Sequence, residues 1–158
     1  MQPTQGTKYT VRDAVQDDVF DITLSVKQFC KEIPHPAWGK ADSNKIKDIV
    51  VNLINHESGF VKVACCEDDI VGVLIGLISS APINDYTFSQ EIMFWFDPDH
   101  RNGKVAHKLI DAYVDWSKRS GCSFSRLSSL DELLGSKVGI LFKRKGFTPV
   151  ETAYVKEL

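Results

Sequence analysis

The feature of this sequence that most constrains its fold is an apolar run, IMFWF (92–96), that leads through a short polar turn straight into a helical pattern. The aromatic-rich run is typical of a β-strand. The turn, DPDHRNG (97–103), contains residues that interrupt regular structure. Apolar residues then recur at helical spacing, at Ala106, Leu109, Ile110, Tyr113 and Trp116. A strand that joins a helix through so short a turn indicates helices packed on a sheet.

Further strands and helices are predicted on both sides of this unit. Residues 8–14 have strand character, and FVKVACC and IVGVLIGLI flank the polar turn EDD as a β-hairpin. Helices are predicted from the Asp17–Asp18 pair and from Asp42 or Ser43, with a proline-containing loop over 33–40 between them. The first has an apolar stripe at Val19, Ile22, Val26 and Phe29, and the second at Ile46, Ile49, Val50 and Leu53. A strand over 122–129, a helix over 133–145 and a last strand over 147–158 follow. The expected fold is therefore α/β, with a mixed sheet and the order β-α-α-β-β-β-α-β-α-β.

Composition and length indicate one globular domain over residues 1–158. Hydrophobic residues make up 43% of the chain and charged residues 25%, without an internal repeat or linker. The formal net charge of −2 gives no global attraction to nucleic acid. The first residues, MQPTQGTKYT, lack the apolar region of a signal peptide, and no apolar run approaches the ~20 residues needed to span a bilayer. We therefore expect a cytoplasmic protein without a membrane segment.

The cysteines do not predict a metal site. Cys30, Cys65, Cys66 and Cys122 lack metal-ligand spacing. Neighbouring strand residues point to opposite faces, which disfavours a disulfide between Cys65 and Cys66. We expect all four to be reduced, buried thiols.

The turn before the central helix is a candidate anion site. Backbone N–H groups in the first turn of a helix lack partners within the helix, and the helix dipole favours negative charge there. Gly103 can adopt a positive φ and lets a ligand approach the backbone, while Arg101 and Lys104 add positive charge. The turn matches neither the nucleoside-triphosphate loop nor the dinucleotide loop. The alternative is an ordinary loop with solvated charges.

Residues Arg101–Ala106, RNGKVA, resemble motif A, Q/R-x-x-G-x-G/A, of the GNAT superfamily of N-acetyltransferases. Pro98 stands where that family often has a proline. VRDAVQDDVFDI (11–22), IVGVLIG (70–76) and ILFKRKGF (140–147) are similar to three further family segments, in the family's order. The resemblance covers nearly the whole chain. It implies a GNAT-like mixed sheet with helices on both faces, and acetyl-coenzyme A (acetyl-CoA) as cosubstrate.

The resemblance also implies which residues bind acetyl-CoA. The predicted coenzyme-binding residues are Phe94, Trp95, Phe96, Arg101, Asn102, Gly103, Lys104, Val105, Ala106 and His107. Amides of 102–107 would bind the pyrophosphate, and amides of 94–96 would polarise the acetyl carbonyl. Lys104 replaces the family's central glycine. Its ammonium could pair with a phosphate, or its side chain could block the close approach that glycine permits.

A carboxylate is expected to act as the general base. Glu91 stands where members of the family often carry a catalytic glutamate, and the alternative is an exposed acid at a strand end. The family's tyrosine, which protonates the leaving thiolate, is replaced by Phe142. Tyr154 or a water molecule could supply that proton instead. A thiolate is also a fair leaving group near neutral pH without such a donor.

The acceptor is expected between the first two helices, the hairpin and the last strands. His35 and Trp38, in the loop with Pro34 and Pro36, could line it together with Tyr86, or the loop could pack on its own domain. The predicted activity is transfer of acetyl from acetyl-CoA to a primary amine of a small molecule or protein by direct attack. Lys104 and Phe142 favour the alternative of a non-catalytic module that binds a CoA species or a protein partner.

A nucleic-acid partner is not favoured by the basic clusters. Lys118–Arg119 and Lys143–Arg144–Lys145 suit helix C-termini and have no aromatic residues between them. The second cluster could also lie near the 3′-phosphate of the coenzyme. A homodimer is compatible with the predicted fold.

Overall fold

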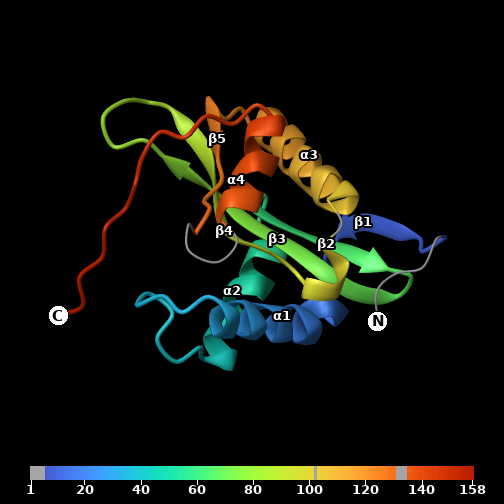
Figure 1. Ribbon diagram of the computed structural model, residues 1–158. Coiled ribbons are helices and arrows are strands. Elements are labelled where there is room, and N and C mark those ends of the chain that lie inside the picture. The colour runs from blue at the N-terminus through green and yellow to red at the C-terminus, as the bar shows by residue number, and fades with distance from the viewer. Residues whose placement is uncertain (1–5, 102, 131–134) are drawn as a thin grey trace.

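Five strands form one mixed sheet in the computed structural model, which describes residues 6–101, 103–130 and 135–158 (Figure 1). In sheet order they are β1 (Tyr9–Asp13), β2 (Gly59–Cys66), β3 (Asp69–Ser80), β4 (Thr87–Phe96) and β5 (Phe124–Arg126). The first four are antiparallel to their neighbours, and β5 runs parallel to β4. The helices are α1 (Val19–Glu32), α2 (Ser43–Asn55), α3 (Lys104–Arg119) and α4 (Gly135–Arg144), with 3₁₀ turns η1 (Gln16–Asp18) and η2 (Pro98–His100). The predicted α/β class is confirmed.

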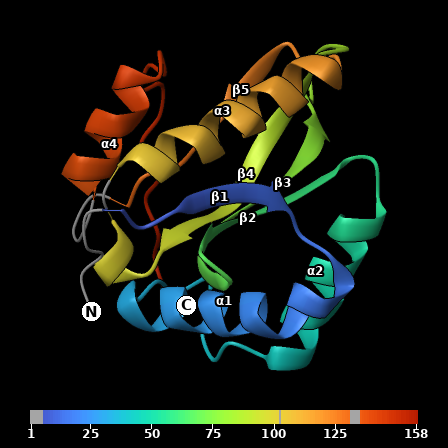
Figure 2. The same ribbon diagram turned by 90° about the vertical axis from the view of Figure 1, so that its right-hand side faces the viewer.

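Helices cover both faces of the sheet, as Figures 1 and 2 show. On the face under α1 and α2, strand residues such as Val63 and Val73 form a core with Ile22 and Val50. On the other face, strand residues including Leu74 and Phe96 pack against α3. Two covered faces explain why β2 and β3 are apolar at nearly every position.

The predicted apolar stripes are largely confirmed, with one error on α2. Ile22, Phe29 and Val50 are buried. Ile49, assigned to the same stripe as Val50, is instead 49% exposed. The sequence step from 49 to 50 turns the side chain by about 100° around the helix, so Ile49 lies outside the face that meets the sheet.

Two aspartates fix the starts of the first helices in different ways. The side chain of Asp42 accepts hydrogen bonds from the amides of Asn44 and Lys45, as expected of a helix cap. Asp18 accepts from both terminal nitrogens of Arg12, at 2.7 and 2.9 Å, and from the Val15 amide. The guanidinium of Arg12 lowers the pKa of Asp18, so this carboxylate ties α1 to β1.

The predicted last strand is wrong. Residues 147–158 form no strand, and Figure 1 shows this tail leaving the body. A last strand needs a neighbour with free backbone groups, and β5 offers only three residues. An ion pair at 3.0 Å joins Glu151 to Arg126 of β5, while Val150 and Tyr154 are 83% and 92% exposed. The tail therefore passes the edge of the sheet without pairing with it.

No described helix is both long and apolar enough to cross a membrane. All four cysteines are free. Cys65 is buried and the other three are half-buried, so the expectation of buried thiols holds fully for Cys65 alone.

Candidate functional site

The edge of β4 that faces β5 is only partly paired. Phe88–Gln90 of β4 pair with Phe124–Arg126 of β5, and β4 then continues to Phe96. Within the described parts of the chain, no strand pairs with this edge of β4 beyond Gln90. The backbone of residues 91–96 is thus open on one side and leads into η2 and α3.

Glu91 lies where the two strands part. The register between β3 and β4 shifts here, since Ile75 pairs with Met93 and Gly76 with Glu91, which leaves Ile92 as an extra residue. Such a bulge changes the direction in which neighbouring side chains point. The carboxylate of Glu91 accepts a hydrogen bond of 3.2 Å from the amide of Ser128, just beyond β5. Glu91 therefore spans the opening between β4 and the segment that follows β5.

The pKa of Glu91 suits a general base. Burial raises this pKa to about 7, and the hydrogen bond from the Ser128 amide opposes the rise only in part. The residue as a whole is half-buried, while its carboxyl group lies deep enough for burial to be the main cause of the raised pKa. A carboxyl group with a pKa near neutrality can accept a proton at working pH and is typical of catalytic acids and bases.

A cluster of hydroxyl groups holds the strands together next to Glu91. Ser117 of α3 hydrogen-bonds to Ser89 of β4 at 2.6 Å and to Ser125 of β5 at 2.9 Å. Ser89 and Ser125 also hydrogen-bond to each other, and the hydroxyl of Tyr113 donates to the carbonyl of Arg126. Sequence analysis missed this cluster, because its members come from three elements and have no common spacing. It fixes the point at which β4 and β5 separate.

The N-terminus of α3 presents backbone donors. Gly103 has a φ of +82°, and a Cβ built there would meet nothing within 4 Å. Along α3, the first amide that donates a hydrogen bond within the helix is that of His107, and its acceptor is the carbonyl of Gly103. No side chain of the described residues caps this helix. Among the described residues, no acceptor is found for the amides of Lys104, Val105 and Ala106, which makes them candidate donors for an anion.

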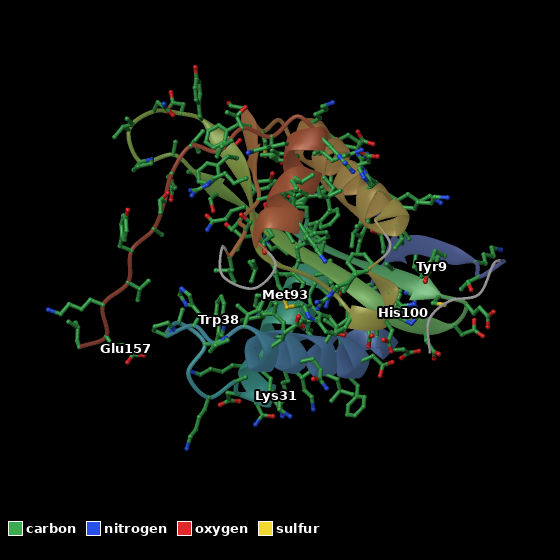
Figure 3. The ribbon with its side chains drawn as sticks, in the orientation of Figure 1. Tyr9, Lys31, Trp38, Met93, His100 and Glu157 are labelled. Carbon is green, nitrogen blue, oxygen red and sulfur yellow. The ribbon has the colours of Figure 1, made fainter. Side chains whose placement is uncertain are left out.

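The side chains around these amides are arranged as follows. Lys104 is exposed, whereas Val105 and Ala106 are buried against the core. Asn102, also predicted to bind coenzyme, lies outside the described residues. A hydrogen bond of 3.0 Å joins Nδ1 of His100, on η2, to the hydroxyl of Tyr9, on β1. Figure 3 shows the two residues side by side. This contact secures the turn from the β1 side.

The guanidinium of Arg101 is held on the opposite side of the turn. Its Nε donates to the carbonyl of Phe96 at 2.9 Å, and Nη2 lies 2.7 Å from Oε2 of Glu32. Glu32 also accepts from Nε1 of the buried Trp95 at 2.9 Å. Arg101, and to a smaller extent Trp95, lowers the pKa of Glu32. Sequence analysis did not single out Glu32, and no local pattern marks it.

Phe142 lies over β4, on the side of the sheet that α4 covers. The Phe142 ring is 6% exposed, with its centroid 6.0 Å from those of Phe94 and Phe147. The structure therefore brings Phe142 close to the open strand edge. Tyr154, an alternative proton donor, is almost fully exposed in the tail.

The predicted acceptor residues are not brought together. Trp38 donates to the carbonyl of Ile33 at 2.6 Å and packs against Phe29 and His35, with ring centroids 5.3 and 4.6 Å apart. This loop thus packs on its own helix. Tyr86 is 56% exposed in the β3–β4 connection, which Figures 1 and 2 show far above the α1–α2 loop.

Two cavities in the described structure lie away from both Glu91 and the start of α3. One, of about 170 Å³, lies beside β1, β2 and the end of α3, and another, of about 450 Å³, lies beside α1 and Gly39. The described residues contain no group of three or more His, Cys, Asp or Glu side chains able to hold a metal ion. The site is therefore an open strand edge and a helix N-terminus.

Comparison with protein families gives one match. The model of the Acetyltransferase (GNAT) family matches residues 23–133, which include β4, the turn and α3. No curated protein matches the chain.

Solved acetyltransferase structures share the fold. The ribosomal-protein-alanine N-acetyltransferase of Brucella melitensis biovar Abortus 2308 superposes with a TM-score of 0.70 and 15% identity, covering 96% of this chain and 99% of that one. The aminoglycoside acetyltransferase meta-AAC0020, from an uncultured soil metagenomic sample and solved with sisomicin, gives 0.71 and 15% identity, with coverage of 95% and 96%. AAC(6')-Iy, in complex with the bisubstrate analogue CoA-S-monomethyl-acetylneamine, gives 0.76 and 15% identity, with coverage of 96% and 99%.

Proposed function

The chain belongs to the Acetyltransferase (GNAT) family, and from this premise we propose that it transfers an acetyl group from acetyl-CoA to a primary amine. The observation that carries the proposal is the open edge of β4. It has Glu91 at one end and, at the other, the N-terminus of α3, which no described side chain caps. In this proposal, a base and an anion site lie along one backbone edge. Residues 1–158 would act as one domain.

Acetyl-CoA would bind along this edge. The amides of Lys104, Val105 and Ala106 suit the pyrophosphate, and the open φ-positive position of Gly103 leaves room for it. The exposed ammonium of Lys104 adds charge, and the Arg101 guanidinium lies on the other side of the turn. The amide-containing arm of the coenzyme could pair with backbone groups of 94–96 on this edge, except the Phe96 carbonyl, which accepts from Arg101.

The transfer then needs one proton acceptor and one leaving group. Glu91, directly or through water, takes a proton from the amine, whose nitrogen attacks the thioester carbonyl. The carbon–sulfur bond breaks, leaving an amide and coenzyme A thiolate, which takes a proton from water. Backbone amides near Phe94 would stabilise the oxyanion. Phe142 cannot donate a proton, so thiolate departure depends on its own basicity.

The acceptor is proposed to be the amine of a small molecule or a protein. The aminoglycoside acetyltransferase meta-AAC0020 was solved with sisomicin, and the Brucella relative is named for a ribosomal-protein alanine. Both kinds of acceptor carry a primary amine. His35 and Trp38 of the α1–α2 loop remain the proposed lining of its site, whereas Tyr86, in the β3–β4 connection, lies too far from this loop to share it (Figures 1 and 2).

A second candidate is a non-catalytic module of the same fold that binds a CoA species. The buried Phe142 at the expected proton-donor position favours it. This alternative keeps coenzyme binding and loses turnover. Binding without acetyl transfer to any member of a panel of small-molecule and peptide amines would support it.

Calorimetric titration of acetyl-CoA, compared with dephospho-CoA, tests the proposal first. We expect binding in the micromolar range, because the turn supplies backbone donors and two cations to the phosphates. Absence of heat at millimolar acetyl-CoA would refute both candidates. Binding should be followed by a thiol-release assay over the amine panel, which separates the transferase from the module.

A further inference from the structure

Glu32 ends α1 at a position where a carboxylate is electrostatically unfavourable. The C-terminus of a helix carries partial negative charge, which disfavours a nearby anion. Lys31, one residue earlier, lies below α1 and away from the sheet in Figure 3. Glu32 is turned to the sheet instead, where it meets Arg101 and Trp95. These contacts, rather than helix propensity, account for a carboxylate here.

The bridge joins two segments that are far apart in sequence. Arg101 is 69 residues from Glu32 and immediately precedes the N-terminal turn of α3. Figure 2 shows the C-terminal end of α1 below η2 and the start of α3. The paired side chains are 26% and 27% exposed, so solvent screens their attraction less than at a surface site. Charge-assisted hydrogen bonds of this length are among the stronger ones.

Glu32 also leads directly into the loop proposed to line the acceptor site. Residues 33–42, here called the acceptor loop, begin at the next residue and carry His35 and Trp38. The loop is internally braced, since Trp38 donates to the Ile33 carbonyl and packs on His35. Because of these internal contacts, we expect the acceptor loop to move largely as a unit. Its position would then depend on the residue at its start, Glu32.

Arg101 can serve the bridge and the coenzyme together. A guanidinium has five N–H donors. One is directed to the carbonyl of Phe96 and one to Glu32, which leaves donors for an anion at the start of α3. An anion that fixes Arg101 therefore also fixes Glu32 and the loop behind it.

We propose that Glu32 is a positioning residue that links the acceptor loop to the coenzyme turn through Arg101, so that bound acetyl-CoA orders the loop. This inference rests on the proposed function, because it assumes that acetyl-CoA binds at the turn. By linkage, an acceptor that orders the loop tightens acetyl-CoA binding by the same factor. The two substrates would then bind cooperatively, with acetyl-CoA preparing the acceptor site.

Hydrogen–deuterium exchange of the full chain, with and without saturating acetyl-CoA, tests the link. In the wild-type protein, acetyl-CoA should slow exchange both at the first turn of α3 and in residues 33–42. Glu32→Gln keeps an acceptor for Trp95 and removes the charge that holds Arg101. In this variant we expect protection at α3 to persist, protection of the loop to disappear, and ligand-free loop exchange to be about tenfold faster.

Asp18→Asn is the matched control. Asp18 also pairs with an arginine, Arg12 of β1, and lies at the opposite end of α1 from Glu32. This variant should lower overall stability and leave the loop response to acetyl-CoA intact. If it also loses the response, the effect is a general loosening of α1 and the proposal is overturned. An unchanged response in Glu32→Gln overturns it as well.

The design separates this inference from the coenzyme assignment. Absence of protection at α3 in the wild-type protein would refute acetyl-CoA binding and with it the coupling. Loop exchange measured without acetyl-CoA would then test whether Glu32 positions the loop. Equal exchange of the loop in wild type and Glu32→Gln would refute this role. If Glu32→Gln does not fold, Arg101→Gln opens the same bridge from the other side. It should lose the loop response while acetyl-CoA still protects the first turn of α3, which shows that the coenzyme remains bound.

Discussion

Replacement of Glu91 by glutamine tests the proposed base most directly. Glutamine has nearly the same shape and can still accept the hydrogen bond from the Ser128 amide, but it cannot take a proton. If Glu91 is the base, turnover at pH 8 should fall by about 10²- to 10⁴-fold while acetyl-CoA binding stays unchanged.

The pKa of Glu91 gives this prediction a pH dependence. With a pKa of about 7, the carboxyl is roughly 10% ionised at pH 6 and roughly 90% at pH 8. The wild-type rate should therefore rise about tenfold between these values. A thiol-release assay with any accepted amine, at saturating acetyl-CoA, measures both effects.

Protein stability should change with pH in the opposite direction. Because burial raises the folded-state pKa of Glu91 above its ordinary value of 4.5, ionisation costs the folded protein free energy. The wild-type protein loses this stability as pH rises from about 4.5 to 7, by at most about 3 kcal/mol and by less because the side chain is only half-buried. Glu91→Gln should remove the loss, as urea unfolding at pH 5 and pH 8 would show.

Glu157→Gln, in the exposed tail, is the control and should change neither quantity. A rate that is flat between pH 6 and 8, or a Glu91→Gln variant as active as the wild type, would refute the assignment of Glu91 as base. A rate that does not change between pH 6 and 8, together with the expected change in stability, would mean that Glu91 has the raised pKa but does not act as the base.

Three further substitutions test other parts of the site. Lys104→Ala should weaken acetyl-CoA binding and reduce the dependence of this binding on salt, as calorimetry at two ionic strengths would show. If Lys104→Ala binds as the wild type does and Lys104→Gly binds more tightly, the lysine contributes nothing to binding. Phe142→Tyr should raise turnover by restoring a proton donor near β4, without changing coenzyme affinity, and equal rates would place this side chain away from the thiolate. Ser117→Ala removes hydroxyl contacts to Ser89 and Ser125 and should cost about 1–2 kcal/mol of unfolding free energy, measured by urea denaturation.

Features that depend on local pattern were predictable from the sequence. The helix at 104–119 has its apolar residues at regular spacing and begins immediately after Gly103, as expected. The β2–β3 hairpin follows from two apolar runs around a polar turn. Asp42 caps α2 because an aspartate side chain can reach amides two and three residues on. Each of these needs only a short stretch of chain to be specified.

Features that depend on distant partners were not. The sequence 147–158 has strand character, but a strand forms only beside a neighbour long enough to pair with it, and β5 is not. The partner of Arg101 could not be predicted, because Glu32 lies far away in sequence with nothing to mark it. The pKa of Glu91 likewise depends on burial by surrounding elements. The sequence motif could suggest Glu91 as a base, but it could not predict the value of its pKa.

The pKa of Glu91 also bears on the choice between transferase and binding module. In the proposed mechanism, Lys104 would affect coenzyme binding and Phe142 would affect only the departure of the thiolate. Neither difference from the family pattern would remove the step that Glu91 would perform. A module that only binds coenzyme gains nothing from a carboxyl whose ionisation is penalised, and glutamine at this position would keep the Ser128 hydrogen bond without that penalty. A base near neutral pKa, by contrast, is what amine deprotonation requires. The raised pKa of Glu91 is therefore a feature that the proposed transferase would use and the binding module would not.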